Sequence, residues 1–318
     1  MPKPHLSLLL ALGVAWLVSA FSGHLDPYHL DVLIGVGINV ILAVSLNLIA
    51  GHTGQFSLGH AGFMAVGAYA ATAVSLFLGP RLIGDSPAQG GFAENALFFG
   101  ALMAGGAAAA LAGLLVGIPS LRLRGDYLAL VTLGFGEIIR VLLQNFEPLG
   151  GALGLNGIPP YTTPFWVIAA VATTVFTVGC LVRSSYGLGF RAVRDDEIAA
   201  AATGLDPARY KVVAFTVGAF FAGVAGSLFA HFKLTITPAG FDFTRSIEIV
   251  VMVILGGLGN TLGVILAAIL LTLLPEFLRP VAEYRLVLYA ALLIALMLLR
   301  PQGLFNFTVR RAKSRAPV

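Results

Sequence analysis

Few side chains in this 318-residue sequence could bind a nucleotide or a metal ion. The pattern Gly-x-x-x-x-Gly-Lys-Ser/Thr, in which backbone amides and a lysine hold the phosphates of ATP, does not occur. His52 and His60 lie eight residues apart in a glycine-rich stretch, a spacing that fits no common set of metal ligands. We therefore expect no catalytic residue, no metal ion and no cofactor bound by this chain.

An uncharged polar segment, rich in glycine, runs from Asn47 to Phe63 between two apolar stretches. Transporters build solute paths from interrupted helices, because the unwound backbone offers hydrogen bonds at membrane depth. A tight turn held by glycine packing would have the same composition, and both interpretations stay open. The first makes Asn47, Gln55, Ser57 and His60 the candidates for lining a translocation path.

A second polar segment, residues 183–211, combines five basic residues with a short alanine-rich stretch. Asp195 and Asp196 can cap a helix through the alanines, because carboxylates accept hydrogen bonds from the free N–H groups at a helix start. Gly204 would end this helix and Pro207 would prevent its continuation. Such a helix could dock into a groove of a partner, or it could lie on the lipid surface as an amphipathic connector.

The composition indicates what kind of protein must position these two segments. Apolar residues make up 58% of the sequence and charged residues 11%, whereas soluble domains carry about 25% charged residues. So few charges cannot cover a water-facing surface of this size. The sequence therefore predicts a membrane protein and excludes a soluble enzyme, a disordered chain and a disulfide scaffold, since Cys180 is the sole cysteine.

The apolar runs are continuous rather than alternating, which favours membrane-spanning helices over a barrel. We predict an all-α polytopic membrane protein with about ten transmembrane helices and glycine-interrupted spans, forming a single transmembrane domain over residues 1–318. The expected spans are residues 6–22, 31–50, 61–79, 97–119, 127–143, 165–182, 212–231, 246–258, 260–275 and 286–300.

Two of these spans carry an alternative. One long tilted helix could replace the spans 246–258 and 260–275, but three glycines and Asn260 favour a break at Gly256–Asn260. The first span, which follows Lys3, could instead be a cleaved signal peptide. We expect the break and a retained first span.

Basic residues near span ends are retained on the cytoplasmic side of a membrane, and they set the expected orientation. With ten spans, 13 of the 19 basic residues fall on the side of the N-terminus, including those of segment 183–211 and of the tail 301–318. We therefore expect both termini, this segment and the tail to be cytoplasmic. The tail lacks interleaved aromatic residues, so attraction to anionic lipid is expected and nucleic-acid binding is not.

Charged residues within spans are costly in a bilayer and are the remaining candidates for a functional role. Glu137 and Arg140 stand one helical turn apart, and the expected arrangement is an ion pair near the membrane interface; a proton relay is the alternative. Asp31 stands at the start of a span and Glu248 near the end of another. The sequence therefore offers little for a carrier driven by protons or sodium ions.

At three places the sequence resembles the permeases of branched-chain amino-acid ABC importers, and among them the LivM type. The similar stretches are residues 51–69, residues 194–204 and the break Leu255-Gly256-Gly257-Leu258-Gly259-Asn260, and Arg300-Pro301-Gln302-Gly303-Leu304-Phe305 fits as well. The resemblance covers about residues 30 to 305.

ABC permeases carry a cytoplasmic Glu-Ala-Ala-x-x-x-Gly coupling loop, and the resemblance places it in segment 183–211. Counting back from Gly204 puts Ile198, Ala199 and Ala200 at the first three positions of that motif, so Glu197 stands one residue early. The resemblance thus implies that this loop contacts the ATPase. The residues expected to take part are Arg194, Asp195, Glu197, Ala199, Ala200 and Gly204. Whether Glu197 itself makes such a contact stays open.

The resemblance further implies a complex in the bacterial cytoplasmic (inner) membrane. Its expected partners are a second related permease subunit, two ATP-binding subunits that use ATP, an extracytoplasmic substrate-binding protein and the lipid bilayer. The expected function is translocation of branched-chain amino acids by a non-enzymatic subunit. The alternatives are a permease for urea, short amides or other amino acids, and a stand-alone secondary carrier or channel.

Overall fold

The computed structural model describes residues 26–83, 91–120 and 126–279, together with a few single residues nearer the two ends of the chain. Most of the expected spans 6–22 and 286–300, and the whole tail 301–318, lie outside the described residues. The longer helices are α2 (Pro27–Asn47), α3 (His60–Ala73), α5 (Phe92–Ser120), α6 (Asp126–Asn145), α7 (Pro164–Arg183) and α10 (Pro207–Lys233). The shorter helices are α4 (Gly79–Ile83), α8 (Ser185–Asp195), α9 (Glu197–Ala202), α11 (Phe243–Gly256) and α12 (Thr261–Phe277).

Among the described residues, six helical segments are long and apolar enough to cross a membrane: Pro27–His52, His60–Arg81, Phe92–Ile118, Tyr127–Asn145, Pro164–Arg183 and Pro207–Lys233. The first two segments each continue an α-helix through a π-helical turn, η2 (Leu48–His52) and η3 (Val74–Leu78). These six segments match six of the expected spans. The structure confirms an all-α polytopic membrane protein, whereas the count of about ten spans is not confirmed.

The helical stretch 247–274 is interrupted at the position that three glycines and an asparagine predicted. α11 ends at Gly256 and α12 begins at Thr261, and Gly257 and Gly259 both have positive φ, at 91° and 82°. Asn260 caps α12 by accepting a hydrogen bond from the N–H of Gly263 at 3.2 Å. At 14 and 17 residues, both helices are shorter than a typical span of about 20 residues.

Glycines allow the central helices to pack without space for side chains. α10 packs mainly against α3 and α5. A β-carbon on Gly226 would collide with the carbonyl of Met64 in α3, and one on Gly67 would collide with the backbone of Gly223 in α10. Gly223 and Gly226 therefore stand where two helix backbones touch, since such close contacts need a missing side chain.

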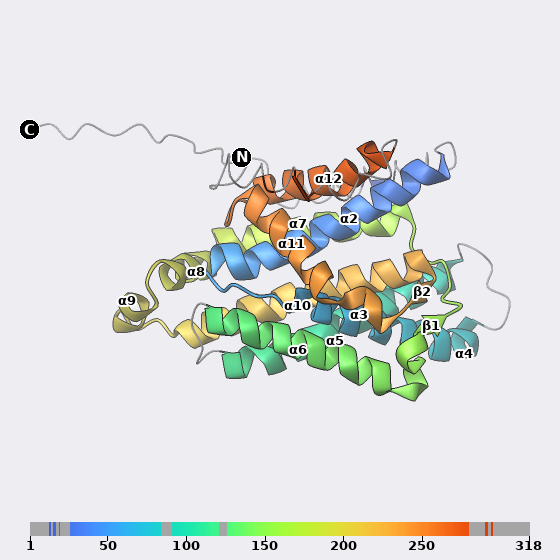
Figure 1. Cartoon of the computed structure of the whole chain (residues 1–318), viewed down its shortest axis with the longest axis horizontal. Helices are drawn as coiled ribbons and strands as arrows, with labels where there is room; N and C mark the ends of the chain where they lie inside the picture. The colour runs from blue at the N-terminus through green and yellow to red at the C-terminus, as the bar shows by residue number, and fades with distance from the viewer. Residues whose placement is uncertain are drawn as a thin grey trace, which may run out of the picture.

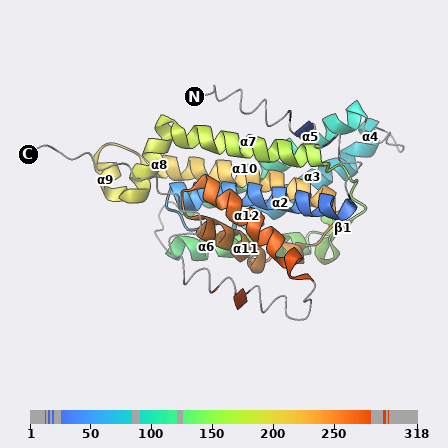
Figure 2. The ribbon, with the colours of Figure 1, turned by 90° about the horizontal axis from the view of Figure 1, so that it is seen from above.

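The helices run between two ends of an elongated molecule (Figures 1 and 2). α8 and α9 lie at one end. At the other end lie α4 and a short antiparallel pair, β1 (Leu155–Asn156) with β2 (Thr235–Ile236), beside the short 3-10 turns η4 (Glu147–Leu149), η5 (Gly151–Leu153) and η6 (Pro238–Phe241). We call the end that carries α8 and α9 the α9 end, and the end that carries α4 and the β1–β2 pair the β end.

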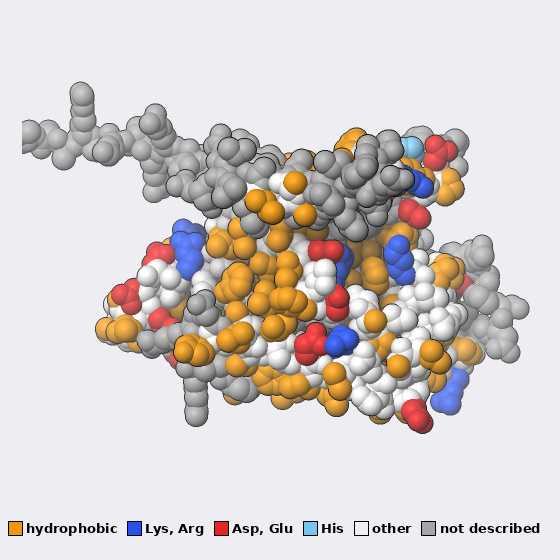
Figure 3. Space-filling view, viewed as in Figure 1, with side chains coloured by type: hydrophobic (Ala, Val, Ile, Leu, Met, Phe, Trp, Pro, Cys, Tyr) orange, Lys and Arg blue, Asp and Glu red, His pale blue; other side chains and the backbone are white. Residues whose placement is uncertain are grey.

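Hydrophobic side chains cover much of the face seen in Figure 3, as expected of a surface that meets lipid or another membrane subunit. Exposed hydrophobic side chains of the described residues include Ile138 and Leu142 of α6 and Leu262 and Leu270 of α12. Charged side chains are fewer on this face.

Candidate coupling site

The short helix expected from residues 195–204 is present as α9. The carboxylate of Asp196 caps it by accepting hydrogen bonds from the N–H groups of Ile198 at 2.9 Å and Ala199 at 3.0 Å. The expected second cap is wrong: Asp195 is the last residue of α8, and its carboxylate pairs with the guanidinium of Arg194 at 3.1 Å. A single carboxylate is placed to meet the free N–H groups, because only Asp196 has left the preceding helix.

Gly204 ends α9 as expected. Its φ of 88° is left-handed, its N–H donates to the carbonyl of Ala201 at 3.0 Å, and the N–H of Leu205 donates to the carbonyl of Ala200 at 3.2 Å. This is the helix end that glycine favours, since a β-carbon strains a left-handed residue. Pro207 does more than prevent continuation, because it opens α10.

An ion pair holds α9 against α10. The ammonium of Lys211 lies 2.8 Å from the carboxylate of Glu197, and the lysine side chain is buried. Ala200 is buried beneath the helix, whereas Ile198 (67% exposed), Ala199 and Gly204 are exposed on its outer side. The carboxylate of Glu197 is thus engaged inside the chain, and the exposed surface of α9 is small and apolar.

Arg194 joins the α8–α9 segment to the Asn47–Phe63 segment. Its Nη1 donates a hydrogen bond to the carbonyl of Gly51 at 3.1 Å. A β-carbon on Gly54 would lie 2.9 Å from the Cγ of Arg194, and one on Gly259 would lie 3.2 Å from its Nη1. The guanidinium therefore contacts one polar segment directly and lies beside the α11–α12 break.

The Asn47–Phe63 segment and the break also contact each other. The side-chain carbonyl of Asn47 accepts a hydrogen bond from the N–H of Gly259 at 2.9 Å. A β-carbon on Gly51 would collide with that asparagine oxygen and with the same N–H group, so glycine is required at this crossing. We call the meeting point of these three segments, around Arg194, Gly51 and Gly259, the junction.

The helix is interrupted between η2 and α3, since residues 53–59 form no helix. Gln55, Ser57 and His60 are buried there together with Asn47. The imidazole Nε2 of His60 lies 2.9 Å from the hydroxyl of Ser45, and the hydroxyl of Ser57 accepts a long hydrogen bond from the N–H of Gly59 at 3.5 Å. The structure therefore places all four expected path residues within one buried polar segment beside the junction.

Several buried polar atoms of this segment have no hydrogen-bond partner among the described residues: the amide nitrogens of Asn47 and Gln55, Nε2 of His52 and Nδ1 of His60. Unpartnered buried polar atoms are uncommon in folded proteins, because each costs free energy unless water or a ligand meets it. The segment thus has hydrogen-bonding capacity in excess of what the chain itself uses.

The ion pair expected within α6 is present. The carboxylate of Glu137 and the guanidinium of Arg140 form the expected ion pair at 2.7 Å. Among the described residues, no group of three or more His, Cys, Asp or Glu side chains could hold a metal ion. The pair uses its charges locally, as an i, i+3 pair on one helix face does.

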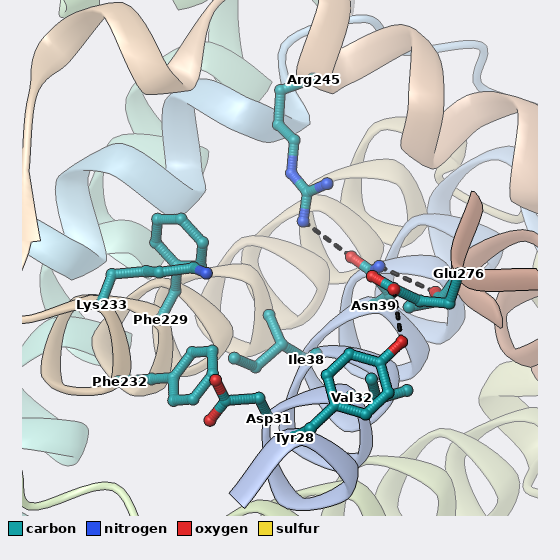
Figure 4. A pocket seen from close by; sticks show the side chains of 12 residues that line it. Tyr28, Asp31, Val32, Ile38, Asn39, Phe229, Phe232, Lys233, Arg245 and Glu276 are labelled. Carbon is teal, nitrogen blue, oxygen red and sulfur yellow. Dashed lines mark hydrogen bonds between the residues drawn. The ribbon is translucent and has the colours of Figure 1, made fainter. Parts of the chain in front are cut away.

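Sequence reasoning missed a polar cavity at the β end, between α2, α10, α11 and α12 (Figure 4). Charged side chains from four separate helices line it: Asp31, Lys233, Arg245 and Glu276. The available signal was that each of these residues stands near the end of an apolar stretch on the same expected side. Their proximity depends on how the helices pack, which no local pattern encodes.

Comparisons with known proteins agree with the resemblance seen in the sequence. Residues 28–299 match the protein family described as "Branched-chain amino acid transport system / permease component". The chain is 39% identical over 246 residues to the "High-affinity branched-chain amino acid transport system permease protein LivM" of Escherichia coli (strain K12), covering 66% of this chain and 58% of that protein. The LivM protein of Salmonella typhimurium (strain LT2) is 38% identical over 254 residues, covering 69% of this chain and 60% of that protein.

A second kind of permease is also similar. The Escherichia coli (strain K12) "High-affinity branched-chain amino acid transport system permease protein LivH" is 29% identical over 146 residues, or 44% of this chain and 46% of that protein. No solved structure matches significantly. The matched region spans about 60% of the length of the LivM relatives. Because the family match covers most of the sequence, the chain belongs to the family of permease components of branched-chain amino acid transport systems.

Proposed function

We propose that this chain is the membrane-spanning permease subunit of an ATP-binding-cassette importer for branched-chain amino acids. It would move substrate delivered by an extracytoplasmic binding protein, beside a second related permease and above two ATP-binding subunits. The names of the LivM and LivH relatives support the substrate class and the pairing of two permeases.

The junction is the observation that carries this proposal. An ATPase that moves during its cycle needs a rigid element to push and a connection from that element to the solute path. α9 offers the element, because its ends are capped and the Glu197–Lys211 ion pair fixes it to α10. Arg194 offers the connection, because it contacts the carbonyl of Gly51.

The α9 end would then face the cytoplasm of a bacterial cell, in its cytoplasmic membrane, with both termini on that side. Four of the described basic residues gather at this end in α8 and in the first turns of α10, as the positive-inside tendency favours: Arg191, Arg194, Arg209 and Lys211. The segment that would contact the ATPase, or hold that contact in place, includes Arg194, Asp195, Ile198, Ala199, Ala200 and Gly204. Glu197 would act from inside, by fixing α9.

The buried segment beside the junction would form part of the translocation path. Asn47, Gln55, Ser57 and His60 present polar atoms without formal charge, and some of these atoms have no hydrogen-bond partner among the described residues. An uncharged lining can exchange hydrogen bonds with a passing solute without trapping it. The chain itself would bind no cofactor, since ATP is used by the partner subunits.

The proposal is tested in proteoliposomes that contain the full importer, by uptake of L-leucine and by ATP hydrolysis stimulated by the loaded binding protein. Ala199→Asp places a charge on the outer side of α9, and Ala199→Ser, which adds a hydroxyl group and no charge at the same exposed position, is its matched control. We expect the first variant to lose about tenfold in both activities, which corresponds to about 1.4 kcal/mol. The control is expected to keep both.

Wild-type uptake by the Ala199→Asp variant would contradict docking through α9. A panel of valine, isoleucine, urea and short amides, offered to the same wild-type vesicles, separates the substrate alternatives. Leucine uptake without added ATP or partner subunits would favour a stand-alone carrier or channel.

A further inference from the structure

The cavity at the β end is the size of a site for one small solute. Its volume is about 290 Å³, near the lower end of the roughly 300–1,000 Å³ that small-molecule pockets occupy. It extends along α2 from Tyr28 to Asn39, eleven residues or about 17 Å at the helical rise of 1.5 Å per residue. The cavity thus leads from the end of the molecule into its interior.

The lining carries two positive and two negative groups that point into the same space (Figure 4). Lys233 and Arg245 supply the cations, and Asp31 and Glu276 supply the carboxylates. Neither Asp31 nor Lys233 forms an ion pair with a described residue. Opposite charges that have no ion-pair partner among the described residues and line one cavity are suited to a solute that carries both signs itself.

The polar groups of the cavity are held in position. The guanidinium of Arg245 pairs with Glu248 at 2.8 Å and donates a hydrogen bond to the side-chain oxygen of Asn39 at 2.7 Å. The amide nitrogen of Asn39 donates to the hydroxyl of Thr272 at 2.9 Å. The carboxylate of Glu276 accepts a hydrogen bond of 2.6 Å from the hydroxyl of Tyr28. The contacts of Asn39 lie at the inner end of the cavity and the Tyr28–Glu276 hydrogen bond lies at its outer end. Together they orient Arg245 and Glu276 before any solute enters.

Apolar side chains complete the lining. Val32 and Ile38 of α2 lie on one side, and Phe229 and Phe232 of α10 lie on the other (Figure 4). Aliphatic and aromatic surfaces favour an apolar substituent over a polar one, because its transfer out of water is favourable. The cavity therefore combines charges of both signs with an apolar wall.

We propose that this cavity is a binding site for a zwitterionic amino acid with an aliphatic side chain. The α-carboxylate would lie near Lys233 and Arg245, the α-ammonium near Asp31 and Glu276, and the side chain against the apolar wall. The inference rests on the proposed function, because it takes a branched-chain amino acid as the solute. The sequence indicated few charged groups within the spans. The proposed site adds a place where four charged side chains could contact the solute.

The test uses thiol labelling of the full-length chain, expressed with its partner subunits and kept in membranes. Val32→Cys in a Cys180→Ala background places a thiol in the cavity, and Ala152→Cys in the same background is the control at the same end. A water-soluble maleimide is added with L-leucine, with N-acetyl-L-leucine, which lacks the ammonium, or with leucinol, which lacks the carboxylate. We expect L-leucine alone to slow labelling at position 32, and no solute to slow it at position 152.

Removing a charged group should weaken this protection. Lys233→Gln, and Asp31→Asn combined with Glu276→Gln, are each expected to raise the L-leucine concentration for half-protection by about tenfold. Glu147→Gln, at an exposed carboxylate of the β end outside the cavity, should leave it unchanged. Equal labelling of position 152 in every variant serves as the check that the proteins are folded and inserted.

Uptake of L-leucine by the same importer is measured in parallel, so that the two proposals fail separately. Uptake without protection at position 32 would overturn the cavity assignment and leave the proposed function intact. Equal protection by all three solutes would also overturn it, because charge recognition would then be absent. If L-leucine is neither taken up nor protective, the proposed function fails, and the amino-acid occupant fails with it.

Discussion

The junction at the α9 end and the cavity at the β end are built from different groups. At the junction, the contacts between segments run through backbone atoms, the carbonyl of Gly51 and the N–H of Gly259, with one guanidinium and one side-chain amide as partners. At the cavity, charged side chains from four helices face an open space. Tightly packed backbone can transmit movement, whereas an open charged space can admit a solute.

Three helices connect these two regions: α2 and α11 contribute to both, and α10 joins α9 to the cavity. α2 carries Asn39 at the inner end of the cavity and Asn47 at the junction, eight residues or about 12 Å apart. α11 carries Arg245 and ends at the break, and α10 carries Lys211 at one end and Lys233 at the other. Movement of α9 would therefore reach the cavity through elements that are already continuous, and coupling between the two sites would be reciprocal.

The largest effect is expected from breaking the core between the two regions. Gly226→Ala adds a methyl group where the carbonyl of Met64 leaves no space, and α10 must shift from α3. We expect it to lower the free energy of unfolding by about 1–3 kcal/mol, the usual cost of overpacking, measured by thermal unfolding in detergent. Gly100→Ala is the matched control, because nothing lies within 4 Å of the added methyl group; it should be neutral or stabilising.

A smaller and local effect is expected at the α9 end. Glu197→Ala leaves the buried ammonium of Lys211 without its carboxylate, so α9 should loosen from α10. The expected cost is about 1 kcal/mol and is confined to this segment, measured as faster proteolysis of segment 183–211. The double variant Glu197→Gln with Lys211→Met removes both charges and should recover resistance. Unchanged proteolysis in Glu197→Ala would show that the pair does not fix α9.

Breaking the connection should separate the two activities without unfolding the protein. Arg194→Ala removes the hydrogen bond to Gly51, so ATP hydrolysis should continue while L-leucine uptake falls about tenfold. Arg191→Ala is the control, since that guanidinium contacts the carbonyl of Val182 and not the junction. Equal losses of hydrolysis and uptake in Arg194→Ala would place its role in ATPase docking instead.

The smallest effect is expected from substitutions of Gly204, which ends α9. Gly204 has a φ of 88° and open space around it, so only backbone conformation limits substitution there. Asparagine tolerates this conformation better than valine does, and we expect Gly204→Asn to be milder than Gly204→Val by about 1 kcal/mol. Stimulated ATP hydrolysis should rank the two variants in the same order. The reverse order would mean that side-chain contacts decide tolerance at this position.

Local features of the sequence were predictable because each depends on neighbouring residues. The Asp196 cap, the left-handed Gly204, the Glu137–Arg140 pair and the break at Gly256–Asn260 all follow from short-range patterns. The expected cap by Asp195 was wrong because the preceding helix continues through that residue. A helix boundary shifts with packing, and composition alone does not fix it to one residue.

The long-range features could not be predicted in the same way. Arg194 and Gly51 are 143 residues apart, and Asn47 and Gly259 are 212 apart, so the junction exists only after the helices pack. The cavity depends likewise on Asp31, Lys233 and Glu276, whose charges looked like ordinary residues at span ends. The sequence indicated each polar segment but did not indicate that the segments contact one another.

The most direct test of the account is the accessibility of the segment beside the junction. Phe56 is 36% exposed whereas Gln55 is buried, so Phe56→Cys in a Cys180→Ala background should react with a water-soluble maleimide and Gln55→Cys should not. Trapping ATP with orthovanadate in the full importer should change the labelling rate at position 56 several-fold, and Arg194→Ala should abolish that change. An identical rate with and without trapped ATP, or a change that persists in Arg194→Ala, would contradict coupling through the junction.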